Sequence, residues 1–243
     1  MKITNKKILI TGGATGIGLA LAERFANDGN KVIICGRREE ALQQAAGKIR
    51  SLITRQCDLS KSEEREQLFR WVQETHPDLN ILVNNAGIQN WMKIDDADFF
   101  EKTKSEIDIN IEAPVHLCHL FVQLSSLQTI MNVTSGLAFV PLTKVPVYCA
   151  TKAFFHSFTI SLRHLLASKN IDVIEIIPPA LNTDLGGKGI HDFAPPVTDF
   201  VDTIFQKLEA GEKTLTDNAS ANLVNAGPEL QQKIFERMNA EDH

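Results

Sequence analysis

The chain has 243 residues, of which 43% are hydrophobic and 23% are charged, a composition that is ordinary for a globular protein and excludes intrinsic disorder as the main state. Its 25 Lys and Arg residues are outnumbered by 30 Asp and Glu residues, which gives a formal net charge of -5. Nucleic acids and anionic membranes require a basic face, so we expect neither as a partner.

Short apolar runs in chain order predict strands at 7–10, 32–35, 52–57, 81–83, 130–133 and 173–177, with a very short seventh strand at 213–216. The runs do not alternate with polar residues, which is typical of strands covered by helices on both faces. Helical spacing predicts helices at 17–27, 39–50, 61–75, 104–127, 147–168, 197–209 and 228–238.

This alternation predicts an α/β protein. We expect a single-domain Rossmann fold over residues 1–243, with a doubly wound parallel sheet of six to seven strands and helices on both faces. The alternative, a (β/α)8 barrel, needs eight strand–helix repeats.

A glycine-rich segment, Thr11-Gly12-Gly13-Ala14-Thr15-Gly16-Ile17-Gly18, lies between the first predicted strand and the first predicted helix. Glycines at this place let backbone N–H groups approach a pyrophosphate at the helix N-terminus. A glycine cluster alone also fits an ordinary tight turn, but its position between strand and helix favours dinucleotide binding.

The end of the second strand indicates which dinucleotide is bound. A free ribose 2′-hydroxyl is usually held by an acidic residue about 20 residues beyond the glycines. Here the chain carries Arg37 and Arg38, and no acid occurs before Glu39. Two guanidinium groups suit a 2′-phosphate, so NADP(H) is favoured over NAD(H). The alternative is that both are solvated charges at the start of a helix.

Further polar residues follow the fourth and fifth strands, at 84–87 and 134–136, where open α/β sheets bind ligands. Tyr148 and Lys152 are four residues apart at the start of a predicted helix, so they share one face. A lysine beside a phenol favours the phenolate, and we therefore expect Lys152 to lower the pKa of Tyr148. Tyr148 is then a candidate general acid and base.

Together these motifs resemble those of the classical short-chain dehydrogenase/reductase family over almost the whole chain. The family pattern TGxxxGxG is met by Thr11, Gly12, Gly16 and Gly18, and the NNAG pattern by residues 84–87. The active-site Asn, the Ser and the YxxxK motif of the family match Asn110, Ser135, Tyr148 and Lys152. Phrases around 133–152 and 177–179 are similar to the bacterial DltE-like oxidoreductases of this family.

The resemblance implies an NADP(H)-dependent oxidoreductase that interconverts a carbonyl and a secondary alcohol. Ser135 and Tyr148 would hydrogen-bond the substrate oxygen, Tyr148 would donate the proton, and Asn110 would keep a water in a relay to Lys152. The residues expected at the cofactor, Asp58 beside its adenine among them, are Gly12, Thr15, Gly16, Ile17, Gly18, Arg37, Arg38, Asp58, Leu59, Asn85, Ala86, Gly87, Tyr148, Lys152, Pro178 and Thr183.

The expected substrate is a small, fairly apolar carbonyl or alcohol compound. The segment 184–196 resembles the substrate lid of the family, although it also fits a plain connection. Apolar residues near the catalytic motifs fit either a substrate pocket or the core: Trp91, Leu137, Phe139, Val140 and Val145. We expect a homodimer built on the two long helices, and a homotetramer is the alternative.

The four cysteines form no CxxC pair and no string of metal ligands with the histidines, so we expect free thiols, no metal and a cytoplasmic location. No apolar stretch reaches the ~20 residues that span a bilayer. Two other functions fit the fold: a non-catalytic NADP-binding sensor or partner protein, and a sugar-nucleotide epimerase. The four matched catalytic residues disfavour the first, and the chain length disfavours the second.

Overall fold

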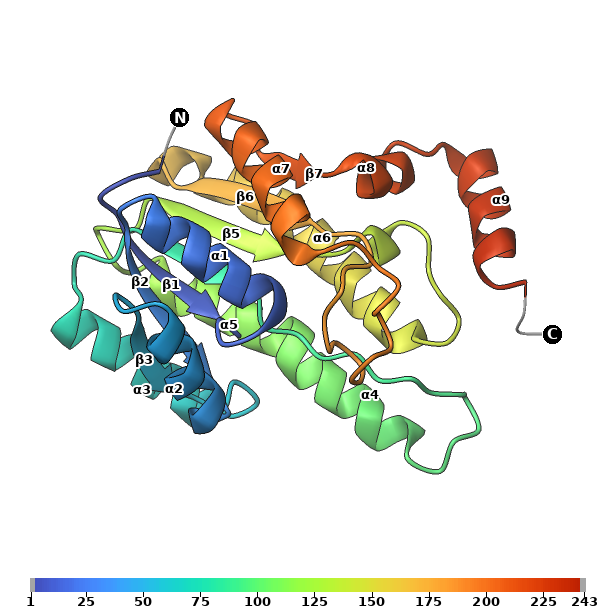
Figure 1. The fold of residues 1–243 in the computed structure, drawn as a ribbon, viewed down its shortest axis with the longest axis horizontal. Helices are drawn as coiled ribbons and strands as arrows, with labels where there is room; N and C mark the ends of the chain where they lie inside the picture. Colours follow the sequence, from blue (N-terminus) through green and yellow to red (C-terminus); the bar gives the residue numbers. More distant parts are fainter. Residues whose placement is uncertain (1–2, 241–243) are drawn as a thin grey trace.

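The computed structural model describes residues 3–240, so residues 1–2 and 241–243 of the predicted domain lie outside the described part. One parallel sheet lies between two layers of helices (Figure 1). The strands are β1 Lys7–Thr11, β2 Lys31–Gly36, β3 Ile53–Gln56, β4 Ile81–Asn84, β5 Thr129–Val133, β6 Asp172–Ile177 and β7 Thr214–Thr216. Their order is β3-β2-β1-β4-β5-β6-β7, and all pairs are parallel. The predicted doubly wound α/β fold is confirmed.

The helices alternate with the strands as the sequence predicts. They are α1 Gly16–Asn27, α2 Glu39–Lys48, α3 Ser62–Thr75, α4 Phe99–Ile107, α5 Ala113–Phe121, α6 Pro146–Leu166, α7 Val197–Glu209, α8 Asn218–Val224 and α9 Pro228–Met238. A π-helix, Asp108–Glu112, joins α4 to α5, and short 3-10 helices occur at Gly136–Ala138 and Ala167–Lys169. The predicted bounds of α7 and α9 agree with the structure.

Two helix predictions need correction. The helix predicted at 104–127 begins earlier, at Phe99, and ends at Phe121. Apolar spacing continues beyond that end because the following turn buries Leu124 and Leu127 in the core beneath it. Helix α8 was not predicted; its N-terminus is capped by Asp217 Oδ1, which accepts hydrogen bonds from Ser220 N and Oγ, both at 2.8 Å.

Each face of the sheet has its own helical layer. In β1, Ile8 and Ile10 pack with α1, α2 and α7, whereas Leu9 packs with α3, α5 and α6. All three side chains are fully buried. Successive strand side chains point to opposite faces, so a strand between two helical layers is apolar at most positions on both faces. This burial explains the uninterrupted apolar runs.

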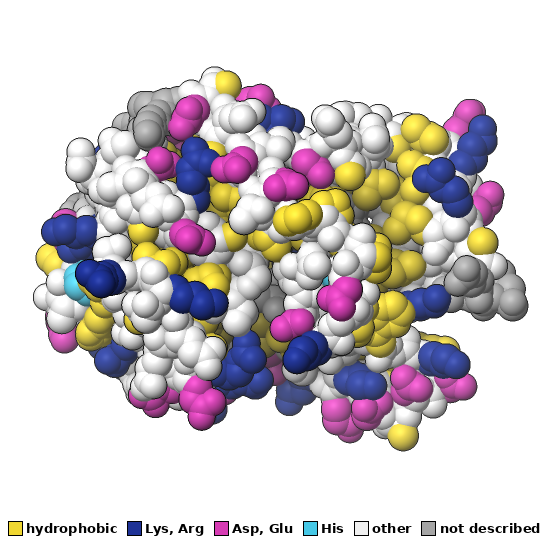
Figure 2. All heavy atoms as spheres, in the orientation of Figure 1, with side chains coloured by type: hydrophobic (Ala, Val, Ile, Leu, Met, Phe, Trp, Pro, Cys, Tyr) yellow, Lys and Arg dark blue, Asp and Glu magenta, His cyan; other side chains and the backbone are white. Residues whose placement is uncertain are grey.

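The C-terminal helix α9 has no fully buried residue and lies away from the sheet (Figure 1). Its end is attached to the loop before α6 by Asn239, whose Oδ1 accepts hydrogen bonds from Thr143 N and Oγ1, both at 2.8 Å. Hydrophobic side chains gather on the side of the molecule where α8 and α9 lie (Figure 2). Across residues 3–240, no helix is both long and apolar enough to cross a membrane.

The second core layer supplies a stability prediction. Phe121 is fully buried and meets the ring of Phe69 edge-on, with 5.3 Å between ring centroids. Replacing Phe121 with Ala leaves a cavity and should lower the free energy of unfolding by about 3–5 kcal/mol, measured by urea denaturation. The matched control is Phe100→Ala on α4, where the ring is 74% exposed, and it should change stability by less than about 0.5 kcal/mol. Equal losses in the two variants would contradict the packing described here.

Candidate active site

The glycine-rich loop passes from β1 into α1 with two residues in the left-handed region, Gly12 at φ 63° and Gly16 at φ 54°. A Cβ atom on Gly12 would lie 2.9 Å from Ala86 Cα, and one on Gly18 would lie 2.4 Å from Gly12 O. Side chains at Gly12 and Gly18 would therefore push apart the loop, the helix and the segment after β4. The loop leaves the first N–H groups of α1 at the sheet edge, which is the geometry that binds phosphate.

The loop after β4 is tied to the loop after β1. Asn85 Nδ2 donates to Thr11 O at 2.9 Å and to Gly12 O at 3.2 Å. Thr11 Oγ1 accepts hydrogen bonds from the backbone N–H groups of Asn85 and Ala86, both at 3.0 Å. The two motifs recognised in the sequence are thus parts of one structure, and the Asn85 amide holds that structure together.

The two arginines expected at the ribose are both exposed at the end of β2, and Arg38 is the N-cap residue of α2. Arg37 acts on Asp58, at the end of β3. Partial burial tends to raise the pKa of Asp58, but hydrogen bonds from Ser60 and the charges of Arg37 and Lys61 outweigh it and lower the pKa. The structure therefore brings Arg37 and Asp58 together, with Leu59 buried beside them.

The remaining residues predicted at the cofactor lie on the same edge of the sheet. Thr15 is exposed as the N-cap residue of α1, and Ile17 follows it, half-buried. Pro178 is buried after β6, and its carbonyl accepts a hydrogen bond from Gly136 N at 3.0 Å. A Cβ atom on Gly16 would lie 3.4 Å from Thr183 Cγ2, so the segment after β6 reaches the glycine-rich loop.

Tyr148 and Ser135 lie in contact. Tyr148 is in the first turn of α6 and is buried, and burial raises the pKa of its phenol well above the usual value. A hydrogen bond with Ser135 lowers this pKa, while the charges of Cys149 and Glu106 raise it further. Ser135 is held in turn by Leu137 N, which donates to its Oγ at 3.1 Å.

Lys152 lies one helical turn beyond Tyr148 on the same face of α6 and is also buried. Its Nζ donates to Val133 O at 2.9 Å and lies 5.6 Å from the centroid of the Tyr148 ring. Burial lowers the pKa of Lys152 to about 8. The prediction that the pKa of Tyr148 is lowered is wrong. Desolvation of the buried phenol dominates and raises this pKa.

Asn110 lies in the π-helix and is buried. Its side chain pairs with both backbone groups of Ile88, accepting from N at 2.9 Å and donating to O at 2.9 Å. Nδ2 also donates to Thr151 Oγ1 at 3.1 Å, and Thr151 donates to Tyr148 O at 2.8 Å. This chain of hydrogen bonds brings Asn110 to the first turn of α6, and Thr151 is a member that the motifs did not indicate.

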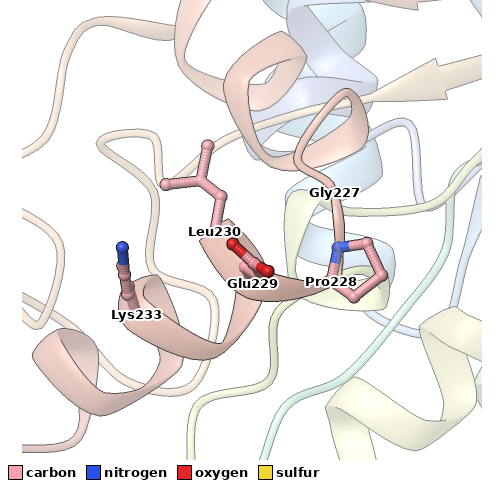
Figure 3. Close-up of a pocket in the computed structure, with 5 residues that line it drawn as sticks. All are labelled: Gly227, Pro228, Glu229, Leu230 and Lys233. Carbon is pink, nitrogen blue, oxygen red and sulfur yellow. The ribbon is translucent and has the colours of Figure 1, made fainter.

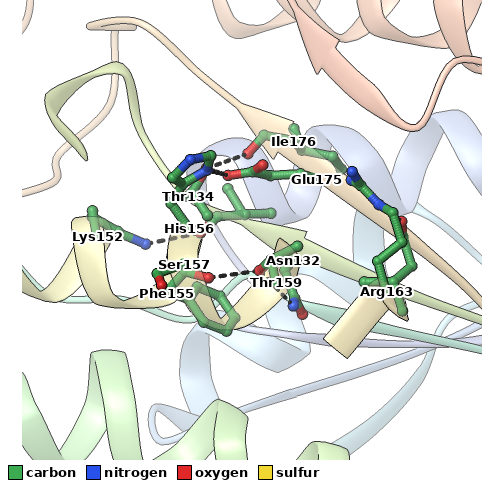
Figure 4. Close-up of polar contacts among 12 residues, drawn as sticks. Asn132, Thr134, Lys152, Phe155, His156, Ser157, Thr159, Arg163, Glu175 and Ile176 are labelled. Carbon is green, nitrogen blue, oxygen red and sulfur yellow. Dashed lines mark hydrogen bonds and ion pairs between the residues drawn. The ribbon is translucent and has the colours of Figure 1, made fainter. Parts of the chain in front are cut away.

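A buried polar network that the motifs do not indicate joins Thr134, His156 and Glu175 (Figure 4). Glu175 Oε1 accepts from Thr134 Oγ1 at 2.7 Å and contacts His156 Nδ1 at 2.8 Å. Glu175 is buried in the middle of β6. Glu175 within an apolar strand is the feature of the sequence that indicates this network, because a buried carboxyl group needs polar partners.

Residues 184–196, the segment expected to form a lid, contact two parts of the site. Leu185 packs on a small buried cluster that contains Tyr148, Cys149 and Val145. A Cβ atom on Gly186 would lie 2.7 Å from Gln89 Oε1 and 3.2 Å from Trp91 Nε1. The lid segment therefore contacts both the first turn of α6 and the residues that follow β4.

The five apolar residues considered for the substrate pocket divide into two groups. Val140 and Val145 are fully buried and belong to the core. Trp91 is 39% exposed, and Leu137 and Phe139 are half-buried near the site. The ring of Phe139 lies 4.5 Å from that of His156, between centroids. Trp91, Leu137 and Phe139 therefore keep exposed surface, whereas Val140 and Val145 do not.

The thiols are free: Cys35, Cys57, Cys118 and Cys149 are all buried. Burial raises the pKa of Cys149 to about 11, so it is a packed thiol rather than an activated nucleophile. Among residues 3–240 no group of three or more His, Cys, Asp or Glu side chains has a geometry that could hold a metal ion.

A cavity of about 550 Å³ lies at the start of α9, and Figure 3 shows its lining by Gly227, Pro228, Glu229, Leu230 and Lys233. None of the predicted site residues lines it. It is therefore separate from the convergence of residues around Tyr148.

Comparisons with known proteins agree with this geometry. The sequence pattern of the short chain dehydrogenase family matches residues 6–192. The chain is 40% identical over 257 aligned positions to the oxidoreductase DltE of Bacillus subtilis (strain 168), with all of both chains covered.

Solved structures show the same fold. A short chain dehydrogenase from Burkholderia cenocepacia, in complex with NADP, has a TM-score of 0.84 at 24% identity, covering 98% of this chain and 99% of that chain. A short chain dehydrogenase/reductase from Burkholderia phymatum, in complex with NAD, has a TM-score of 0.84 at 18% identity, covering 98% and 97%.

The family resemblance predicted from the motifs, including the likeness to DltE, is thus confirmed. From the family match over residues 6–192 and the full-length likeness to DltE, we conclude that the chain belongs to the short-chain dehydrogenase/reductase family of oxidoreductases.

Proposed function

We propose that the protein is an NADP(H)-dependent oxidoreductase that interconverts a carbonyl and a secondary alcohol on a small, fairly apolar substrate. The observation that carries this proposal is the contact between Ser135 and Tyr148, with Lys152 on the same face of α6. A hydroxyl pair beside a buried amine at the carboxyl edge of a parallel sheet is suited to bind a carbonyl oxygen and transfer a proton to it.

The catalytic residues in this proposal are Asn110, Ser135, Tyr148 and Lys152. Ser135 and Tyr148 hydrogen-bond the substrate oxygen, and Tyr148 donates its proton in reduction and accepts one in oxidation. Lys152, with a pKa near 8, takes up and releases protons at ordinary pH and returns one to Tyr148 through a relay that Asn110 orders.

The residues along the sheet edge fit a nicotinamide dinucleotide. Gly12 and Gly16 have positive φ and keep the loop free of side chains, which leaves room for a pyrophosphate at the N-terminus of α1. We propose that the cofactor is held by Gly12, Thr15, Gly16, Ile17, Gly18, Arg37, Arg38, Asp58, Leu59, Asn85, Ala86, Gly87, Tyr148, Lys152, Pro178 and Thr183. When bound, the nicotinamide supplies or accepts the hydride.

The preference for NADP(H) rests on Arg37 and Arg38, which are both exposed at the end of β2. Asp58 is near Arg37 but is engaged by Ser60, whose N and Oγ donate to its Oδ1 at 3.1 and 2.8 Å. The Oδ1 atom of Asp58 is therefore occupied by hydrogen bonds from its own turn. The guanidinium groups of Arg37 and Arg38 remain available for a 2′-phosphate.

We propose one domain in which residues 184–196 act as the substrate lid. Leu185 packs against Tyr148, and Gly186 lies next to Gln89 and Trp91. Exposed apolar side chains on α6, Phe154, Ile160 and Leu165, support a homodimer built on the long helices, with a homotetramer as the alternative. We assign the protein to the cytoplasm, where its four buried thiols stay reduced.

The first prediction concerns Tyr148→Phe. Removal of the hydroxyl eliminates the proton donor but keeps the ring that packs beside Leu185. Cofactor binding, followed by nicotinamide fluorescence, should stay within about twofold, whereas turnover should fall by about 10²- to 10⁴-fold.

The matched control is Cys149→Ala, at the neighbouring position of α6, which should retain most of the turnover because its thiol is a packing group. Normal turnover of Tyr148→Phe would show that Tyr148 is not the proton donor. If the wild type bound neither NADPH nor NADH, a non-enzymatic function would be favoured instead.

The second prediction concerns cofactor choice. Arg37→Ala and Arg38→Ala should each weaken NADPH binding by about tenfold or more, because a hydrogen bond to a charged group contributes about 1.5–3 kcal/mol. NADH binding should change by less than about twofold, since NADH lacks the 2′-phosphate.

Arg50→Ala is the control, because Arg50 is an exposed arginine just beyond the other end of α2. Equal losses of NADPH and NADH in the two test variants, or a wild-type preference for NADH, would reject the arginines as 2′-phosphate ligands.

A further inference from the structure

Glu106 is a buried carboxyl group beside the proposed catalytic centre. It lies in the last turn of α4 with no exposed surface. Its Oε1 accepts hydrogen bonds from Asn90 N at 2.6 Å and Asn90 Nδ2 at 3.1 Å. Its Oε2 is buried and has no hydrogen-bond partner among residues 3–240. Such a group is costly to bury, and a leucine at this position would avoid that cost.

Glu106 and Asn110 hold the same segment of chain. They are four residues apart on the run formed by α4 and the π-helix. Asn110 pairs with both backbone groups of Ile88, and Glu106 pairs with Asn90 two residues farther on. Lys102 of α4 adds a third contact, from its Nζ to Trp91 O at 3.5 Å. The segment 88–91 is therefore held at three points by side chains from one helical run.

The segment 88–91 lies between the buried lysine and the lid. A Cβ atom on Gly87, which precedes it, would lie 3.5 Å from Lys152 Nζ. Trp91, at its other end, has its Nε1 3.2 Å from the position that a Cβ on Gly186 would take. A movement of this segment would therefore alter both the surroundings of Lys152 and the contact between Trp91 and Gly186.

We propose that Glu106 is a positioning residue, whose carboxylate holds the segment 88–91 between Lys152 and residues 184–196. The effect on turnover rests on the proposed function, but the hold on the segment does not. Hydrogen bonds to a carboxylate are roughly twice as strong as those to a neutral acid, so the hold tightens when Glu106 loses its proton.

The change occurs near neutral pH. Burial raises the pKa of Glu106 to about 7, against the opposing effect of the two Asn90 hydrogen bonds. The titratable groups that face it from α6 are Tyr148 and Cys149, and the charge of Glu106 raises the pKa of both. Both of these groups stay protonated at neutral pH. Lys152, on the same helix and close to Gly87, has a pKa of about 8, so its titration lies above that of Glu106 and persists in Glu106→Gln.

Trp91 reports on this change without any measurement of activity. The chain has two tryptophans, and Trp71 lies 4.9 Å from the ring of His76, whose titration would interfere. In a Trp71→Phe background, the emission of Trp91 should follow a sigmoidal pH titration with a midpoint near 7. Adding Glu106→Gln, which keeps a carbonyl acceptor for Asn90 but cannot ionise, should abolish that titration.

Two further variants make the result specific. Asn90→Ala removes one hydrogen bond that favours the carboxylate, so the midpoint should rise. His191→Asn removes the histidine of the lid and should leave the midpoint unchanged. A midpoint that persists in Glu106→Gln, stays fixed in Asn90→Ala or disappears in His191→Asn would overturn the proposal.

Turnover provides the second readout. One pH unit below 7, about a tenth of Glu106 is ionised, so the pH profile of kcat should contain a step with a midpoint near 7 in the wild type. That step should be absent in Glu106→Gln, whereas a step near pH 8 from Lys152 should remain in both proteins. A Trp91 titration that depends on Glu106, together with an inactive wild type, would reject the proposed function and retain the positioning role. An active wild type whose pH profile is unchanged by Glu106→Gln would overturn the positioning role and retain the function.

Discussion

The parallel alignment of the strands is the constraint on which the site depends. All neighbouring strands run in the same direction, with Ile10 beside Val83, Val83 beside Met131 and Val133 beside Ile176. The segments that follow β1, β4, β5 and β6 therefore emerge at one edge, although they are distant in the sequence. Hydrogen bonds across that edge, such as Asn85 to Gly12 and Gly136 to Pro178, then fix these segments to each other.

Polar groups buried beneath the edge give the site its rigidity. Asn84, Asn132 and Thr159 form a chain of hydrogen bonds from β4 across β5 to α6. Thr134 and His156 share the carboxylate oxygen of Glu175 on β6. An unsatisfied polar group in the core is costly, so each of these partners restricts the others to one arrangement. The strand end that carries Ser135 and the helix that carries Lys152 thereby keep a fixed relation.

The sequence predicted the sheet and most of the site because both rest on local patterns. Apolar runs without alternation indicate burial on two faces, and Tyr148 and Lys152 share a helical face by spacing alone.

Three features could not be predicted from local patterns. The end of α5 was placed too late because a buried turn preserves helical spacing of Leu124 and Leu127. The hydrogen bonds of Asn110 to Ile88 and of Glu106 to Asn90 depend on the packing of α4 against a loop, which no local pattern encodes. The pKa of Tyr148 was predicted in the wrong direction because the spacing showed a neighbouring lysine but not the desolvation of the phenol.

Burial also determines which protonation states the site favours. Desolvation disfavours the charged form of every group, so it raises the pKa of Tyr148 and lowers that of Lys152. The carboxylate of Glu106 acts on Tyr148 in the same direction as burial, whereas the hydrogen bond with Ser135 opposes both. The balance leaves the phenol protonated at neutral pH. A protonated phenol is the form that donates a proton to a carbonyl oxygen in the proposed reduction. Oxidation of an alcohol instead requires the phenolate, the form that burial of Tyr148 disfavours.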